Sequence, residues 1–147
     1  MKKESKQQEL QELISRSEES ILYIPTQHEV DYHDPSFPVD IPPHHIFVPQ
    51  DRKSDPFDWA AHCIQVCQDK NVSLFIPGTQ CDRYSTRWGR GGGWYDRFLS
   101  RVPSHWLRIC IVHAAQFSST RLLRQDWDEP MDWIIVKHTT SWEIYKT

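Results

Sequence analysis

The chain has 147 residues, of which 38% are apolar and 25% are charged, and its formal net charge is −3. This length and composition are ordinary for one soluble domain, and the acidic balance excludes a global positive field that would attract nucleic acid or anionic lipid. No apolar run approaches the roughly 20 residues that cross a bilayer, and the polar N-terminus has no apolar signal region. We therefore expect a single domain over residues 1–147, placed in the cytoplasm, with no membrane or nucleic-acid partner. The sequence leaves the oligomeric state open.

Hydrophobic periodicity predicts helices that alternate with short apolar strands. The predicted elements are, in chain order, a helix over 5–20, strands over 21–24 and 46–48, a helix that opens at Asp55-Pro56, a strand over 72–76, a helix over 94–102, and strands over 107–112, 132–136 and 141–145. Residues 26–45 are rich in Pro, Asp and His and are predicted to form a long loop. This alternation indicates an α/β fold with a mostly parallel sheet flanked by helices, in which ligands bind at the carboxyl ends of strands.

The helix that opens at Asp55-Pro56 is predicted to bury one face. Trp59, Cys63 and Cys67 recur along it, with Ala60 and Ile64 beside them. Cysteine pairs on an apolar stripe usually belong to the core. The alternative is a zinc site, because zinc takes His and Cys ligands, and loop histidines are available at His28, His33, His44 and His45.

The most specific feature is a glycine cluster that follows the predicted strand over 72–76. Four of the five glycines are Gly89, Gly91, Gly92 and Gly93. Consecutive glycines let backbone N–H groups converge on one anion, and a helix N-terminus behind them adds further donors. Arg87 and Arg90 can donate to phosphate oxygens, and Asp96 is placed to hold a hard cation beside them. The spacing fits neither a Walker A loop nor a dinucleotide fingerprint.

A second interpretation of this cluster is an RGG-like segment for single-stranded nucleic acid. Arg87-Trp88-Gly89-Arg90 and the residues that follow interleave arginine, glycine and tryptophan. Such segments usually repeat within disordered tracts, whereas this one occurs once, between a predicted strand and a predicted helix. The phosphate site is therefore the preferred interpretation.

The stretch PGTQCDRYSTRWGRGGGWYDRFL resembles the segment PGLAFD-x-x-G-x-RLG-x-G-x-GYYD-x-x-L of the 5-formyltetrahydrofolate cyclo-ligase family. The two align without a gap, and the matches are Pro77, Gly78, Asp82, Arg87, Gly89, Gly91, Gly93, Tyr95, Asp96 and Leu99. The family's following strand, glutamine and D-x-x-x-D segment have counterparts in Ile109 to Val112, Gln116 and Asp128 to Asp132. The resemblance is strongest over residues 72–136.

This resemblance implies an ATP- and magnesium-dependent ring closure of 5-formyltetrahydrofolate to 5,10-methenyltetrahydrofolate. It implies that Mg²⁺ is held by Asp96 and Asp128, and that Arg90 and Tyr95 act at the reacting groups, Tyr95 in the folate pocket. The residues it implies for ATP are Arg87, Gly89, Arg90, Gly91, Gly92, Gly93, Trp94 and Tyr95.

The chain departs from the family pattern in two places. Lys2 and Lys6 keep the spacing of the family's N-terminal Lys-x-x-x-Arg pair, but no strand and folate-contacting Glu follow in order. Residues 7–25 are therefore predicted to match the family's later helix and second strand, which leaves part of the ATP and folate sites without counterparts. Within the motif, Cys81, Ser85 and Trp88 replace an aromatic, a turn glycine and a leucine. The alternative function is thus a non-catalytic homologue that binds nucleotide or folate.

Overall fold

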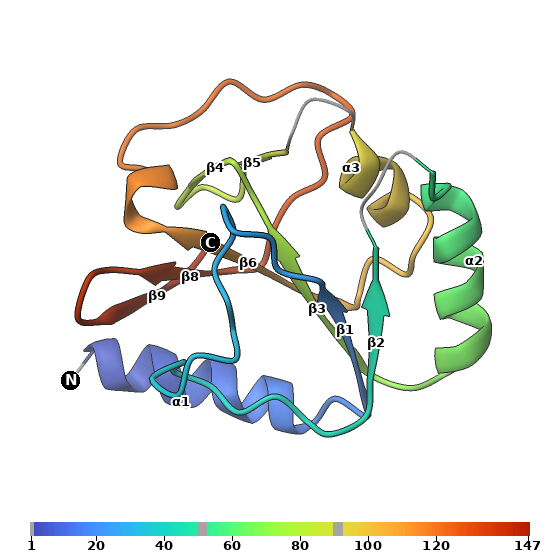
Figure 1. Cartoon of the computed structure of the whole chain (residues 1–147), viewed down its shortest axis with the longest axis horizontal. Coiled ribbons are helices and arrows are strands. Elements are labelled where there is room, and N and C mark those ends of the chain that lie inside the picture. Colours follow the sequence, from blue (N-terminus) through green and yellow to red (C-terminus); the bar gives the residue numbers. More distant parts are fainter. Residues whose placement is uncertain (1, 50–52, 90–92) are drawn as a thin grey trace.

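The fold is an α/β architecture built on a six-stranded sheet (Figure 1). The computed structural model describes residues 2–49, 53–89 and 93–147, with side chains from residue 6. The helices and strands are α1 (Lys2–Ser15), β1 (Glu19–Tyr23), β2 (His45–Val48), α2 (Pro56–Cys67), β3 (Val72–Pro77), β4 (Gln80–Asp82), β5 (Arg87–Trp88), α3 (Trp94–Leu99), β6 (Leu107–His113), a 3-10 helix (Ala114–Gln116), β7 (Phe117–Ser118), β8 (Trp133–Lys137) and β9 (Trp142–Lys146). None of the described helices has both the length and the apolar character that a bilayer crossing requires.

The large sheet has the strand order β2-β1-β3-β6-β8-β9. All neighbouring pairs are parallel except β8 and β9, which are antiparallel. Helices α2 and α3 pack together on one side, while α1 lies on the other side and contacts β9 (Figure 1). The predicted α/β class, with a mostly parallel sheet flanked by helices, is confirmed.

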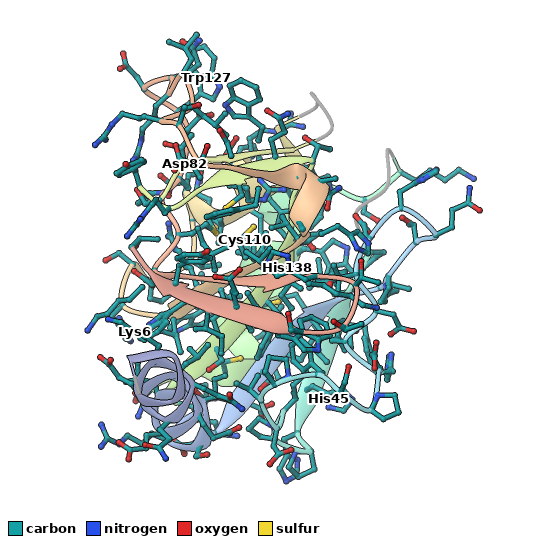
Figure 2. All side chains as sticks on the ribbon, turned by 90° about the vertical axis from the view of Figure 1, so that its left-hand side faces the viewer. Lys6, His45, Asp82, Cys110, Trp127 and His138 are labelled. Carbon is teal, nitrogen blue, oxygen red and sulfur yellow. The ribbon has the colours of Figure 1, made fainter. Side chains whose placement is uncertain are left out.

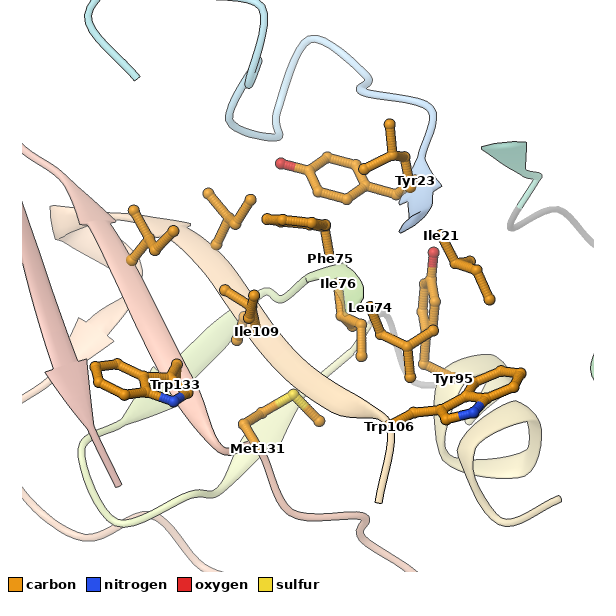
Figure 3. Close-up of a cluster of buried hydrophobic side chains, with 14 of the residues drawn as sticks. Ile21, Tyr23, Leu74, Phe75, Ile76, Tyr95, Trp106, Ile109, Met131 and Trp133 are labelled. Atoms are coloured by element: carbon orange, nitrogen blue, oxygen red, sulfur yellow. The ribbon is translucent and has the colours of Figure 1, made fainter. Parts of the chain in front are cut away.

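The core follows from strands that are buried on both faces. All six residues of β3 are buried, as expected for a central parallel strand covered by helices. Figure 3 shows Leu74 of β3 among Ile21, Tyr95 and Trp106, which come from three other parts of the chain. The helix predicted over 5–20 forms but ends at Ser15, because the chain enters β1 at Glu19. Leu10 and Ile14 of this helix are fully buried, and Leu13 is half-buried against the core.

The buried face predicted for α2 is confirmed for Ala60, Cys63 and Cys67, whereas Trp59 is only half-buried and the prediction is wrong for Ile64. The helix begins at Pro56, as predicted, and Asp55 caps it by accepting the Phe57 N–H. The buried face is formed by Pro56, Ala60, Cys63 and Cys67, which follow the 3.6-residue period. Ile64 lies about 100° around the helix from Cys63 and faces solvent.

The route from β3 to α3 corrects a second prediction. The strand was expected to lead directly into the glycine loop, but the hairpin of β4 and β5 intervenes and forms a small sheet with β7. Asp82 makes this turn possible, because its carboxyl accepts the N–H groups of Tyr84 and Thr86. Helix α3 also ends at Leu99, short of residue 102, and Pro103 disfavours helical geometry at the residue before it.

Ser85 occupies the left-handed turn position of this hairpin, with φ of 86°. A residue with a Cβ is strained there by about 1 kcal/mol or more. We expect relief of this strain in Ser85→Gly to raise the free energy of unfolding by up to about 1 kcal/mol. Two effects reduce this gain: glycine increases the entropy of the unfolded chain, and the hydrogen bond from Arg124 to the Ser85 hydroxyl is lost. Urea unfolding would measure the change. Ser85→Ala is the control, because it removes the same hydrogen bond and keeps the Cβ. A free energy of unfolding that is no higher in Ser85→Gly than in Ser85→Ala would show that any strain at Ser85 is no larger than the entropy cost of glycine.

Candidate functional site

A pocket of about 1170 Å³ opens at the carboxyl ends of β1, β3 and β6. Glu29 follows β1, Gly78 and Thr79 follow β3, and Gln116 follows β6, and all of them line this pocket. This is where a parallel α/β sheet places its ligands. We call it the main pocket.

Every predicted site residue that the structure describes lines the main pocket. These residues are Arg87, Gly89, Gly93, Trp94, Tyr95, Asp96 and Asp128. The other three predicted residues, Arg90, Gly91 and Gly92, lie outside the described residues. Residues that were predicted from the sequence to share one site, and that lie up to 41 positions apart from Arg87 to Asp128, therefore line the same pocket.

Residues around the described part of the glycine loop hold its two ends. Thr79 donates its N–H to the Trp88 carbonyl at 2.8 Å and its hydroxyl to the Gly89 carbonyl at 2.8 Å. At the far end, Gly93 has φ of 66°, and among the described residues no atom beyond its chain neighbours lies within 4 Å of where a Cβ would be. The loop thus enters from a fixed strand and leaves through a left-handed position that favours glycine.

Arg87 lies deeper than a simple phosphate ligand would. Arg87 is only 4% exposed, and its Nε donates to the Pro77 carbonyl at 2.5 Å. The guanidinium lies 5.1 Å from the centre of the Tyr95 ring. Arg87 therefore braces the pocket floor between β3 and α3, while the residue still contributes to the lining.

Tyr95 lines the pocket and carries an unsatisfied polar atom. The residue is buried, and its hydroxyl has no hydrogen-bond partner among the described residues. Burial raises the pKa of Tyr95, so the hydroxyl stays protonated and available as a donor. Buried hydroxyls are normally paired, which makes this one suited to a polar ligand atom.

Asp96 and Asp128 reach the pocket from α3 and from the loop before β8. Asp96 Oδ1 accepts the Glu129 N–H at 3.1 Å, and Asp128 Oδ2 accepts the Gln125 N–H at 2.8 Å. Burial raises the pKa of Asp96, and the negative charges of Asp128 and Glu129 add to that rise. A cation bound between the carboxylates would offset both effects.

The carboxylates of Asp96 and Asp128 fit a magnesium ion that takes its remaining ligands from substrate phosphates and water. Mg²⁺ is usually held by one or two carboxylates together with substrate phosphates, and keeps several waters. Two carboxylates supply that minimum, and among the described residues there is no group of three or more His, Cys, Asp and Glu side chains placed to hold a metal. The zinc alternative loses support, because Cys63 and Cys67 are buried in the core while the four loop histidines are exposed.

Arg108 of β6 anchors the segment that carries Asp128. Its guanidinium donates to the Glu129 carboxylate at 3.5 Å, to the Pro130 carbonyl at 3.4 Å and to the Leu99 carbonyl at 3.1 Å. The Arg108 N–H also donates to Asp132 Oδ2 at 2.9 Å. One buried arginine thereby connects the end of α3 to the loop before β8, and so connects the supports of both carboxylates.

Several lining residues were not predicted from the sequence as part of the site. They are His28, Glu29, Ser54, Thr79, Trp88, Leu123, Gln125 and Trp127. Most lie in loops without periodicity, so no local pattern marks them. Trp88 and Trp127 carried a usable signal, because each stands next to a predicted site residue.

The fold and the pocket define the class first: an α/β protein with a large ligand pocket at the carboxyl ends of a mostly parallel sheet. The model of the 5-formyltetrahydrofolate cyclo-ligase family matches residues 1–137, and the chain belongs to this family. The match extends well beyond residues 72–136, where the sequence resemblance was strongest.

Among solved structures, the chain is similar to a 5,10-methenyltetrahydrofolate synthetase from Mycoplasma pneumoniae. The TM-score is 0.55 and the sequence identity 19%, over 90% of this chain and 82% of that chain. At this identity the likeness concerns the fold. No curated protein gives a significant match to the chain.

Proposed function

We propose that this chain converts 5-formyltetrahydrofolate to 5,10-methenyltetrahydrofolate with ATP and Mg²⁺. The observation that carries the proposal is the meeting of Asp96, Asp128 and both described ends of the glycine loop in one pocket. The reaction needs the formyl group and the terminal phosphate side by side, and this pocket is large enough for two ligands. Its family membership supplies the substrate class.

In the proposed reaction, the formyl oxygen attacks the γ-phosphorus of ATP, and the bond from that phosphorus to its bridging oxygen breaks, which releases ADP. The folate's second nitrogen then attacks the activated formyl carbon and loses its proton, and phosphate leaves with the former formyl oxygen. Phosphoryl transfer depends chiefly on positioning and charge neutralisation. Bound Mg²⁺ supplies charge neutralisation at the phosphates.

The chain's residues divide between these tasks. Asp96 and Asp128 would hold the metal, and the glycine loop with Arg90 would receive the phosphates, while the buried Arg87 would support the loop from the pocket floor. Tyr95 would offer its unpaired hydroxyl to a polar atom at the folate side. Gly78 allows the Arg87 side chain to pack closely against the backbone at the pocket floor, because a Cβ at Gly78 would lie only 3.3 Å from Arg87 Cγ.

The decisive test follows methenyl-folate absorbance in purified protein given 5-formyltetrahydrofolate, ATP and Mg²⁺. Turnover that requires all three supports the proposal. Binding of ATP or folate without turnover would contradict it and would establish the alternative, a non-catalytic homologue. That alternative rests on the expectation that residues 7–25 match the family's later helix and second strand, which would leave part of the ATP and folate sites without counterparts.

MgATP is also expected to stabilise the folded chain. A ligand at 100 times its dissociation constant contributes about 2.7 kcal/mol. For a chain of this length this corresponds to a rise in Tm of several degrees. Thermal unfolding with and without millimolar MgATP measures it, with Mg²⁺ alone as the control. An unchanged Tm would contradict a nucleotide site in the main pocket.

A further inference from the structure

Three exposed apolar side chains gather at the mouth of the main pocket. Trp88 is 37% exposed, Trp127 66% and Leu123 72%, and all three line the pocket. We call this set the aromatic rim. Figure 2 shows Trp127 beyond Asp82, at the end of the molecule opposite α1. Large apolar side chains gathered on one side of a pocket usually mark a binding surface.

Hydrogen bonds within the protein fix the segments that carry the aromatic rim. Trp88 Nε1 donates to the Leu123 carbonyl at 2.9 Å, which ties the hairpin to the loop that carries Leu123 and Trp127. The same loop is fixed at its start by the Leu122 N–H, which donates to Asp82 Oδ2 at 2.7 Å. Because the indole N–H is used inside the protein, the ring surface of Trp88 is what remains for contact with a ligand.

The position of the rim in the chain identifies its occupant. Trp88 immediately precedes Gly89 of the glycine loop, and Trp127 immediately precedes Asp128. Each indole is therefore one residue from a group assigned to phosphates or metal. A nucleobase is joined to its phosphates through a single ribose, so a base whose phosphates lie beside Gly89 and Asp128 would occupy the side of the pocket that carries the two indoles. In the proposed function the folate takes a separate position, on the side of the pocket lined by Tyr95.

We propose that Trp88 and Trp127 form the surface on which the base of the nucleoside triphosphate stacks. The inference rests on the proposed function, because it takes ATP as the ligand of the main pocket. Aromatic stacking is worth about 1–3 kcal/mol per base, as measured by alanine substitution. It is tolerant of base identity, since every base presents a flat π surface.

The test compares three probes on the intact chain: MgATP, magnesium tripolyphosphate and 5-formyltetrahydrofolate. Trp127→Ala is expected to weaken MgATP binding about tenfold, which corresponds to about 1.4 kcal/mol. Tripolyphosphate has the phosphates without a base, so its affinity is expected to stay unchanged, as is that of the folate. Trp127→Phe keeps a flat ring and is expected to retain most of the MgATP affinity, whereas Trp127→Leu keeps only apolar area and is expected to lose it. Trp88→Ala is expected to act in the same direction.

Phe47→Ala is the matched control, because Phe47 is 42% exposed and does not line the main pocket. It is expected to change none of the three affinities. Weaker folate binding with unchanged MgATP binding in Trp127→Ala would assign the rim to the folate and overturn the inference. Unchanged binding of all three probes would overturn it as well. If the unmodified chain bound neither MgATP nor tripolyphosphate, the proposed function itself would fail together with this inference, a result distinct from the other two.

Discussion

Asp96→Asn is expected to lower cyclo-ligase turnover by at least about tenfold, or roughly 1.4 kcal/mol in the barrier. The amide can still accept the Glu129 N–H, so the local geometry is kept while the charge that would hold Mg²⁺ is lost. Asp128→Asn should act in the same direction. Raised magnesium should restore part of the activity in both variants. Wild-type turnover in Asp96→Asn would show that the family's metal role does not apply at this position.

Stability measurements separate a metal ligand from a structural carboxylate. Burial raises the pKa of Asp96 in the free protein, so the ionised form is disfavoured by folding. The stability of the ligand-free chain therefore falls as the pH rises from the ordinary aspartate pKa to the raised pKa of Asp96, and above that raised pKa the full cost of the charge remains. Asp96→Asn removes the charge and is expected to raise or preserve the Tm of the ligand-free chain at neutral pH, while the stabilisation by MgATP shrinks. Loss of Tm without ligand would contradict this role.

Much of the site was predictable because its strongest signals are local. Glycine clusters, a following helix and a nearby carboxylate occupy consecutive positions, so the stretch around Gly89, Gly93 and Asp96 could be assigned from the sequence. Asp128 is different, since nothing in its surroundings distinguishes it from a solvated carboxylate. Only the alignment with the family indicated it, and its neighbour Trp127 received no role at all.

The errors in the fold have a common physical origin. Strands β4, β5 and β7 contain only two or three residues each, too few to show a period. Their pairing depends on a turn whose geometry comes from Asp82 and on contacts with a segment some 35 residues away. Ile64 shows the same limit on a helix, because Cys63 and Ile64 are both apolar and only the packing decides which is buried.

Asp82→Ala is expected to lower the free energy of unfolding by about 3 kcal/mol or more, since a buried donor left unpaired costs about 1–3 kcal/mol. The Asp82 side chain is fully buried and accepts three backbone N–H groups: Tyr84 at 2.8 Å, Thr86 at 3.1 Å and Leu122 at 2.7 Å. The first two close the β4–β5 turn, and the third holds the start of the loop that leads to Trp127. Removal of this carboxyl therefore frees the hairpin and the pocket wall together. Urea unfolding would measure the loss.

Asp82→Asn refines the expectation, because it separates the two halves of the carboxyl. Its remaining oxygen can still serve the turn, whereas its NH₂ group would face the Leu122 N–H, so the loss should be roughly 1–2 kcal/mol. Asp126→Ala is the matched control, since Asp126 lies on the same loop and is exposed. It is expected to change stability by less than about 0.5 kcal/mol. If Asp82→Ala and Asp126→Ala had equal effects, the turn would not depend on this carboxyl. The loop that carries Leu123 and Trp127 would then be held chiefly by the contacts of Arg108 and by the hydrogen bond from Trp88 to the Leu123 carbonyl.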